Sequence, residues 1–180
     1  MLEKKEYIGQ KDIKENIATL LVEAFPEDER PPVPYFFSSL ERKGNSLFSY
    51  YLHDEFIGFA YVTLYQDICY IFFLAVKENK RHQGYGGEIL EDIKKAYHDY
   101  VILLCYEEVE PRYPNYQERI KRKEFYSIHG FKDNNMKTNE FGVVFETAFF
   151  GNHRVDFNTY VEIFVLGFGE FAREHIKLAS

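Results

Sequence analysis

The sequence contains no tryptophan, two methionines and two cysteines among its 180 residues. It has no apolar run that approaches the ~18 residues of a membrane-spanning helix. The opening residues, MLEKKEYIGQ, lack the apolar core of a signal peptide. These absences argue against a membrane partner and favour a cytoplasmic location.

The two cysteines, Cys69 and Cys105, stand far apart inside apolar runs. Apolar surroundings favour buried thiols over a disulfide. The sequence also has no CxxC pattern and no Cys/His spacing of the kind that metal sites use. We therefore expect two buried free thiols and no metal.

Positive charge is scarce and scattered: 22 Lys and Arg residues stand against 29 Asp and Glu residues, for a net charge of -7. A nucleic-acid partner is not expected, because phosphate backbones are bound by clustered positive charge. The acidic balance weakly favours a cationic substrate such as an amine. Apolar residues make up 46% of the chain, which is enough to close the core of a single domain over 1–180.

Hydrophobic periodicity predicts alternating strands and helices in the order β-α-(α)-β-β-β-α-β-α-β-β-α. This order is typical of an α/β (α+β) sandwich with a mixed, mostly antiparallel central sheet flanked by helices. The expected strands are 5–8, 46–53, 56–65, 68–76, 101–105 and the two arms of a hairpin over 132–150. The expected helices are 12–25, 35–41, 87–97, 116–129 and an aromatic-rich helix over 159–176 at the C-terminal end.

Several residues mark the expected ends of these elements. Asp12 with Glu15, and Thr159 with Glu162, have the spacing of capping boxes at helix starts. Gly130 is placed to end the helix before it. The last hairpin is expected to turn near 141–142.

The segment RHQGYGGEIL (81–90) places three glycines between an expected strand and an expected helix. The first amides of a helix have no internal partners and carry partial positive charge, and glycines let a phosphate approach them. The segment therefore suits a diphosphate, with Arg81 as an added cationic group. The nucleotide P-loop is excluded because no GK[ST] follows, and the dinucleotide pattern GxGxxG is also absent. A tight turn without a ligand is the simpler alternative.

The pattern R-x-x-G-x-G, formed by Arg81, Gly84 and Gly86, resembles the acyl-CoA loop of the GNAT superfamily of acyl-CoA-dependent N-acyltransferases. Its flanks, FFLAVKENKRHQGYGGEIL, are similar to the superfamily's fourth strand, loop and third helix. RIKRKEFYSIHGF (119–131) is similar to the fourth-helix signature of the same superfamily. The two blocks stand in the expected order and cover the core of the chain, roughly 56–131.

The resemblance implies a fold and a set of cofactor contacts. The fourth and fifth strands are expected to splay apart, and the pantetheine arm of acetyl-CoA to lie in the gap as an extra strand. An amide at the end of the fourth strand, that of Val76, is expected to polarise the acyl carbonyl. The residues expected to bind the cofactor are Leu74, Ala75 and Val76 through their backbone and Arg81, Gln83, Gly84, Tyr85, Gly86 and Gly87 around the diphosphate.

The resemblance also implies catalytic groups. Tyr126 matches the tyrosine that protonates the departing thiolate, although packing is the alternative in a chain with 15 Tyr and 18 Phe. Glu107 and Glu108 follow the expected fifth strand, and either could take the amine proton, directly or through water, or bind the amine. They could equally belong to a solvated acidic loop. Tyr106 is a competing polar group.

Two further segments leave alternatives open. AFPEDERPPVPYFF (24–37) occupies the place of an acceptor wall, where Glu27, Asp28 and Glu29 could attract a cation, or it is only a proline-braced surface loop. The aromatic C-terminal helix covers the sheet or contributes a homodimer contact.

The resemblance implies an N-acetyltransferase that moves an acetyl group from acetyl-CoA to a primary amine by direct attack in a ternary complex. The alternative is a non-catalytic module that binds or senses acyl-CoA. The sequence leaves open which amine is the acceptor, a small molecule or a peptide. It also leaves open whether acetyl is the only acyl group transferred.

Overall fold

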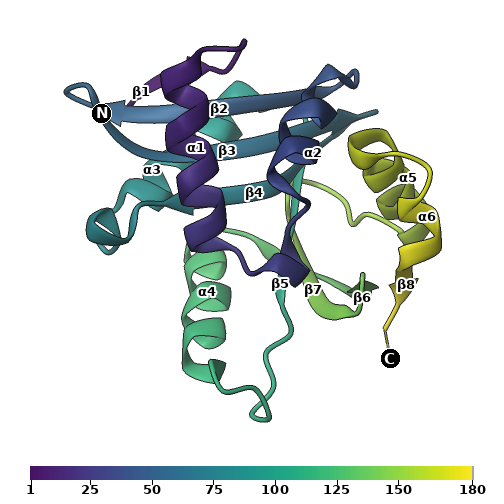
Figure 1. Ribbon diagram of the computed structural model, residues 1–180. Helices are drawn as coiled ribbons and strands as arrows, with labels where there is room; N and C mark the ends of the chain where they lie inside the picture. Colours follow the sequence, from purple (N-terminus) through teal and green to yellow (C-terminus); the bar gives the residue numbers. More distant parts are fainter. Residues whose placement is uncertain (180) are drawn as a thin grey trace.

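The computed structural model describes residues 1–179, and within this range one sheet of eight strands forms the centre of the molecule (Figure 1). The strand order is β1-β2-β3-β4-β5-β7-β6-β8. All neighbouring pairs are antiparallel except β4 and β5, which run parallel. The strands are β1 (Glu3–Glu6), β2 (Asn45–Leu52), β3 (Glu55–Tyr65), β4 (Ile68–Val76), β5 (Val101–Glu107), β6 (Lys132–Glu140), β7 (Val143–Phe150) and β8 (Ile176–Leu178).

Helices cover both faces of this sheet. The long helices α1 and α5 pack on one face together with the short α2, and α3 packs on the other. The helices are α1 (Lys11–Ala24), α2 (Val33–Ser38), α3 (Tyr85–Ala96), α4 (Tyr116–Ile128), α5 (Phe157–Phe168) and α6 (Ala172–His175). The expected mixed, mostly antiparallel sheet flanked by helices, with an extra C-terminal helix, is therefore confirmed.

Strands β4 and β5 separate partway along their length, as expected. Their pairing covers only Ile68–Ile71 against Val101–Leu104 and then stops. Beyond that point β4 keeps its pairing with β3 on its other edge as far as Val76. The edge of β4 that faces β5 is therefore open from Phe72 onward.

A bulge in β4 lies at the point of separation. Val62 of β3 pairs with Ile71 and Tyr61 pairs with Phe73, so Phe72 is an extra residue in the ladder. A bulge turns two successive side chains toward one face and increases the local twist. Phe72 and Phe73 accordingly both pack on the side of Phe168 in α5.

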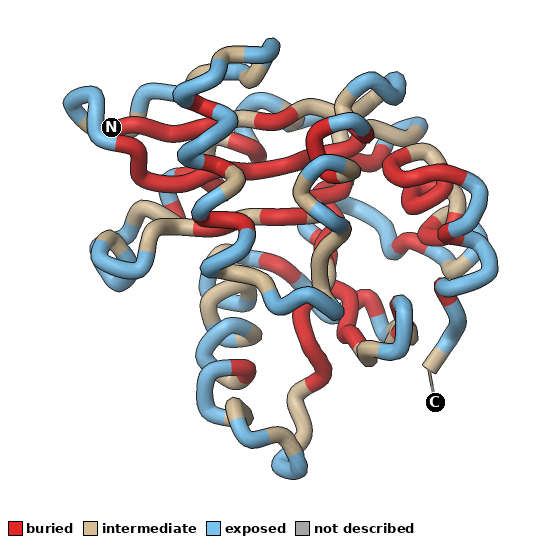
Figure 2. Tube along the Cα trace, viewed as in Figure 1, coloured by how far each residue is buried: buried red, intermediate tan, exposed pale blue. Residues whose placement is uncertain are grey.

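Most of the core belongs to the central strands and to one stripe of each long helix (Figure 2). Helix α1 contributes Ile13, Ile17, Leu20 and Leu21, which recur at helical spacing. Helix α4 differs, because Arg119 is its one buried residue and its cavity-facing flank is only partly covered. Helix α4 thus borders a cavity and contacts the core mainly through the partly buried Phe125 and Tyr126.

The structure corrects the expected helix starts. Helix α1 begins at Lys11 after Gln10, with no side-chain cap, so the predicted capping box of Asp12 and Glu15 is wrong. Helix α5 is capped by Asp156, whose carboxylate accepts a hydrogen bond from the Thr159 amide. The predicted capping box of Thr159 and Glu162 was therefore placed one helical turn too late.

The C-terminal segment differs from the single helix that was expected. Helix α5 ends at Phe168, and Gly169 follows with a φ of 109° that L-residues rarely adopt. The chain then forms α6 and the edge strand β8, which pairs with β6. Strand β8 has only three residues, too few for its alternation to be recognised in the sequence.

Candidate active site

The loop between β4 and α3 presents a row of open amides. Gly84 caps α3 with a φ of 87°, and a Cβ added there would meet nothing within 4 Å. The first internal bond of the helix runs from the Glu88 amide to the Gly84 carbonyl. Within residues 1–179 the amides of residues 83–87 have no backbone or side-chain acceptor, and residues 81–84 are exposed. This loop has the geometry of an anion site at a helix N-terminus.

The other two glycines of the loop have a packing role. A Cβ on Gly86 would lie 3.2 Å from the Phe125 ring, and one on Gly87 would lie 2.6 Å from the His129 ring. The start of α3 can therefore approach α4 closely only because both residues are glycine. Gly84 serves the backbone turn, whereas Gly86 and Gly87 serve the contact between the two helices.

Arg81 braces the loop against the end of β4. Its Nε donates a hydrogen bond to the Val76 carbonyl at 3.1 Å, while the residue stays exposed. Next to it, Lys80 forms an ion pair with Glu55 at 2.6 Å. The loop is thus anchored to β3 and β4, and the Arg81 guanidinium keeps further donors for a ligand.

The open edge of β4 offers backbone groups to the gap. The Ala75 carbonyl points at Gly58 of β3, where a Cβ on Gly58 would lie 2.2 Å from it. Backbone groups of successive strand residues point to opposite sides. The amides and carbonyls of Leu74 and Val76 therefore face the gap, and those of Ala75 do not.

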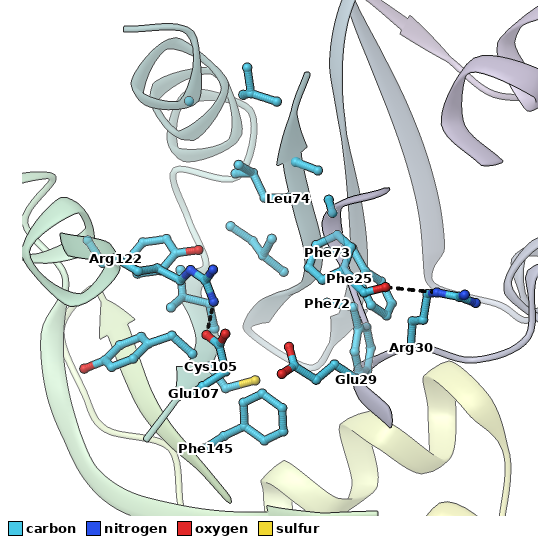
Figure 3. A pocket seen from close by; sticks show the side chains of 18 of the residues that line it. Phe25, Glu29, Arg30, Phe72, Phe73, Leu74, Cys105, Glu107, Arg122 and Phe145 are labelled. Carbon is cyan, nitrogen blue, oxygen red and sulfur yellow. Dashed lines mark hydrogen bonds and ion pairs between the residues drawn. The ribbon is translucent and has the colours of Figure 1, made fainter. Parts of the chain in front are cut away.

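A single large cavity of about 1340 Å³ joins the loop, the gap and the space under α5 (Figure 3). At one end it is lined by the α3 loop and the last turns of α4, including Tyr126 and His129. The strands β4 and β5 form its middle, and the α1–α2 connection forms a wall. Residues Leu74, Ala75, Val76, Arg81, Gly84, Gly86, Gly87, Tyr126 and Glu107 all line it. Among the residues predicted from the sequence, Gln83, Tyr85 and Glu108 do not.

Tyr126 lies in α4 on the cavity wall. Its ring stacks on Tyr106 of β5 at 5.8 Å and packs edge-on against Phe131. Burial raises the pKa of Tyr126 to about 12, although the positive charge of Arg122 opposes this rise. The phenol therefore stays protonated at neutral pH and can donate its proton.

Two carboxylates point into the middle of the cavity (Figure 3). Glu107, the last residue of β5, is buried and forms an ion pair with Arg122 of α4. Glu29, from the turn after α1, is half-buried, and within residues 1–179 it has no ion pair within 4 Å. Burial raises the pKa of Glu29, with the Arg122 charge acting in the opposite direction.

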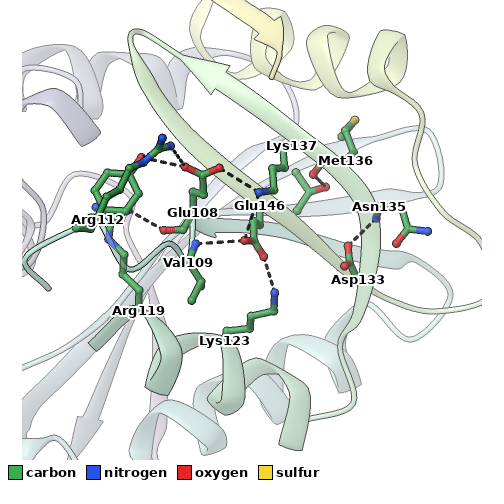
Figure 4. A network of polar contacts seen from close by, with 12 residues as sticks. Glu108, Val109, Arg112, Arg119, Lys123, Asp133, Asn135, Met136, Lys137 and Glu146 are labelled. Carbon is green, nitrogen blue, oxygen red and sulfur yellow. Dashed lines mark hydrogen bonds and ion pairs between the residues drawn. The ribbon is translucent and has the colours of Figure 1, made fainter. Parts of the chain in front are cut away.

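Glu108 lies on the other side of the sheet edge, in a network of charged side chains (Figure 4). Its carboxylate accepts hydrogen bonds from Arg112 at 2.5 Å, Lys137 at 3.0 Å and Tyr113 at 3.0 Å. These donors, and Lys137 first among them, outweigh the burial of Glu108 and lower its pKa. The network ties the β5–α4 connection to β6, and Glu108 lies outside the large cavity.

A second buried acid, Glu140, also lines the cavity, and nothing in the sequence pointed to it. Its Oε1 accepts hydrogen bonds from Thr138 at 2.7 Å and Tyr160 at 2.5 Å. Tyr160 in turn contacts Tyr70 at 2.9 Å, and Tyr70 contacts the Cys105 sulfur at 3.1 Å. Burial raises the pKa of Glu140 to about 7. These residues come from three strands, β4, β5 and β6, and from helix α5, which only the fold brings together.

The cysteines only partly match the prediction. Cys69 is buried, whereas Cys105 is half-buried, and both are free thiols. The Cys105 side chain lines the cavity, because residues beyond the β4–β5 separation lose their covering strand. Burial raises its pKa well above the ordinary value, so the thiol stays protonated.

Two negative findings apply to residues 1–179. No group of three or more His, Cys, Asp or Glu side chains is arranged to hold a metal ion. No helix in that range has both the length and the hydropathy to cross a membrane.

The family comparison agrees with this geometry. The model of the acetyltransferase (GNAT) family matches residues 14–131, from α1 through the end of α4. The matched segment contains the α3 loop, the open edge of β4 and Tyr126. This chain belongs to the acetyltransferase (GNAT) family.

Solved structures of the same family share the fold. A protein from Bacteroides thetaiotaomicron, assigned to the GNAT family, superposes with a TM-score of 0.73 at 19% identity and covers 93% of this chain and 99% of its own. A GNAT acetyltransferase from Elizabethkingia anophelis with acetyl-CoA bound superposes with a TM-score of 0.62 at 16% identity. This match covers 84% of the present chain and 98% of the relative. The aminoglycoside 6'-N-acetyltransferase from Enterococcus faecium superposes with a TM-score of 0.64 at 16% identity. This match covers 86% of the present chain and 99% of the relative. At such identities the likeness establishes the fold. No curated protein matches the sequence.

Proposed function

We propose that this chain transfers an acetyl group from acetyl-CoA to a primary amine by direct attack within a ternary complex. The observation that carries the proposal is the open edge of β4, which leads straight to the unpaired amides at the start of α3. An extended arm with a diphosphate at one end fits such a continuous row of backbone donors and acceptors. The Elizabethkingia anophelis relative, solved with acetyl-CoA bound, has the same fold.

The loop residues hold the diphosphate in this proposal. The amides of Gln83, Gly84, Tyr85, Gly86 and Gly87 lie without acceptors at the N-terminal, positive end of the α3 dipole. Arg81, anchored to the Val76 carbonyl, adds a charged donor beside them. Gly84 is the residue whose missing side chain leaves the approach free.

The backbone of β4 holds the pantetheine arm. Leu74 and Val76 turn their amides and carbonyls toward the gap, and Ala75 between them also lines the cavity. The acyl end of the cofactor lies farther from α3 than its diphosphate does. The amide of Leu74 is therefore better placed than that of Val76 to polarise the acyl carbonyl.

The chemical step exchanges one bond for another. The amine nitrogen forms a bond to the acyl carbon, the carbon–sulfur bond breaks, and Tyr126 gives its proton to the departing sulfur. On the way to the amide the ammonium nitrogen loses two protons: one restores the Tyr126 phenol by way of water, and the other is released. The products are therefore the amide, the free thiol of CoA and one proton.

Glu29 is the stronger candidate for receiving the amine proton. Its burial raises its pKa above the ordinary value of a glutamate, and no ion pair within residues 1–179 holds it in the charged state. The Glu107 carboxylate is already occupied by its ion pair with Arg122, whereas that of Glu29 is free to receive a proton. We assign to Glu107 the positioning of Arg122 and to Glu108 a structural role in the β5–α4 connection.

The test is an incubation with acetyl-CoA and a panel of primary amines, with release of the free thiol and the mass of the amide as readouts. Thiol release that depends on the amine, with a matching amide product, supports the proposal. Binding of acetyl-CoA without thiol release from any amine would instead identify a non-catalytic module that binds acyl-CoA. No binding of acetyl-CoA would contradict both functions.

A further inference from the structure

The part of the cavity beneath α5 is walled by aromatic rings, and we call it the acceptor chamber. Phe72 of β4 lies 4.8 Å from both Phe164 and Phe168 of α5, measured between ring centroids. Tyr35 of α2 lies 5.9 Å from Phe171 at the rim. The rings that line the chamber are Tyr35, Phe72, Phe145, Phe164, Phe168 and Phe171.

The chamber arises from the bulge in β4 and from the aromatic content of α5. The bulge places Phe72 and Phe73 on the same face, next to α5, where an unbulged strand would have placed these successive side chains on opposite faces. Phe145 of β7 pairs across the ladder with Glu107, so its ring and that carboxylate share a face. Apolar walls therefore surround the point where the acyl group and the amine meet.

The charges inside the chamber leave room for one cation. Glu107 is already neutralised by Arg122, and Arg30 is turned toward the Phe25 carbonyl. Glu140 has no ion pair among residues 1–179, but its Oε1 already accepts hydrogen bonds from the hydroxyl groups of Thr138 and Tyr160. Glu29 is therefore the inner carboxylate that has neither a cation within 4 Å nor a hydrogen-bond donor on its oxygens among residues 1–179.

Additional carboxylates stand only at the outer edge. Glu27, Asp28 and Glu124 also line the cavity but are exposed, so water and salt screen their attraction for a cation. A second or third ammonium group inside the chamber would lose its hydration without gaining a partner, which is costly. An apolar body would instead gain free energy by burying its surface against the rings.

We propose that the acceptor is a monoamine whose single ammonium group lies beside Glu29 and whose aromatic or alkyl body lies among the rings of the acceptor chamber. This assignment rests on the proposed function, because the chamber is an acceptor site only if the acetyl group is delivered through the β4–β5 gap. It separates this chain from enzymes that acetylate polycations, such as its structural relative from Enterococcus faecium, the aminoglycoside 6'-N-acetyltransferase.

The first measurement compares four amines at pH 7.5 under saturating acetyl-CoA: 2-phenylethylamine, hexylamine, spermidine and kanamycin. We expect kcat/KM for the first two to exceed that for the two polycations by about tenfold or more, the gain from burying a few methylene-sized groups. Equal or faster acetylation of spermidine or kanamycin overturns the assignment.

The second measurement uses two phenylalanines on the same strand. Phe145→Ala removes a ring from the chamber, whereas Phe150→Ala removes one that lies outside the cavity and packs on Phe131. We expect Phe145→Ala to raise the KM for 2-phenylethylamine by about tenfold, with unchanged affinity for acetyl-CoA, and Phe150→Ala to leave both unchanged. An unchanged KM in Phe145→Ala overturns the assignment.

A third variant guards against loss of folding. Phe171 is 46% exposed at the chamber rim, so Phe171→Ala tests the same wall at little cost to stability. We expect a KM raised about threefold for 2-phenylethylamine and unaltered for methylamine, which has no body to bury. A KM for methylamine that rises by the same factor contradicts the assignment.

Calorimetry with acetyl-CoA alone distinguishes the two proposals. If acetyl-CoA binds and only the preference among amines differs from this expectation, the chamber assignment fails and the proposed function stands. If acetyl-CoA does not bind, the proposed function fails first.

Discussion

Replacing Glu140 with glutamine should change how the stability of the protein depends on pH. Glu140 is 7% exposed, and its Oε1 accepts hydrogen bonds from Thr138 and Tyr160. The other titratable groups of this cluster are Tyr70, Tyr160 and Cys105, whose pKa values burial raises well above the ordinary values. Glu140 is therefore the group of this cluster that titrates between pH 5 and 8.

The magnitude follows from the two pKa values. Burial raises the pKa of Glu140 from 4.5 to about 7 in the folded protein, whereas the unfolded chain keeps the ordinary value. Between these values the unfolded state loses its proton first, so the free energy of unfolding falls as the pH rises. The difference of about 2.5 pH units, at about 1.4 kcal/mol per unit, corresponds to about 3 kcal/mol. This contribution to stability is fully present below pH 4.5 and has been lost once the pH exceeds 7.

Urea unfolding at several pH values from 5 to 8 measures this effect. We expect the free energy of unfolding of the wild type to fall relative to that of Glu140→Gln by about 2 to 3 kcal/mol across the range, because glutamine cannot titrate. All other titrating groups are common to the two proteins and cancel in the difference. The exposed Glu23→Gln is the control, and its difference from the wild type should stay flat. A flat difference for Glu140→Gln as well would refute the reasoning.

Three further variants test other parts of the account. Tyr126→Phe should lower kcat roughly 100-fold with unchanged affinity for acetyl-CoA, and full activity would assign the proton to another group. Glu29→Gln should lower kcat/KM for the amine at least about tenfold at pH 7.5, measured by thiol release, and an unaltered value would remove Glu29 from the site. Gly58→Ala should lower the free energy of unfolding by about 2 kcal/mol in urea titrations, because its Cβ would lie 2.2 Å from the Ala75 carbonyl. Wild-type stability in that variant would contradict the close pairing of β3 and β4.

The central part of the fold could be predicted because its signals are local. Strand β4 was expected over 68–76 and observed there, since nine consecutive apolar residues bounded by a turn leave few alternatives. The turn at Phe141–Gly142 and the helix end at Gly130 were also correct, because glycine there adopts a positive φ. The glycine loop and the FYSIHGF segment led to the correct family.

The composition of the cavity could not be predicted, because it depends on contacts between distant residues. The bulge at Phe72 is a one-residue shift in the β3–β4 ladder that no sequence pattern marks. Glu140 and Tyr160 form a hydrogen bond across 20 residues, and Glu140 looked like an ordinary polar residue before a turn. The positions of Glu107 and Glu108 on opposite sides of the sheet edge follow from strand β5 running two residues farther than expected.

The most direct test of the account is the binding of acetyl-CoA to Gly84→Val, measured by isothermal titration calorimetry. Gly9→Val is the matched control, because Gly9 also has a positive φ and open space around it but lies in the connection between β1 and α1, outside the cavity lining. The account predicts a Kd for acetyl-CoA that rises about tenfold or more in Gly84→Val and stays at the wild-type value in Gly9→Val, since only the first side chain blocks the amides at the start of α3. A wild-type Kd in Gly84→Val would contradict the assignment of the diphosphate to this loop.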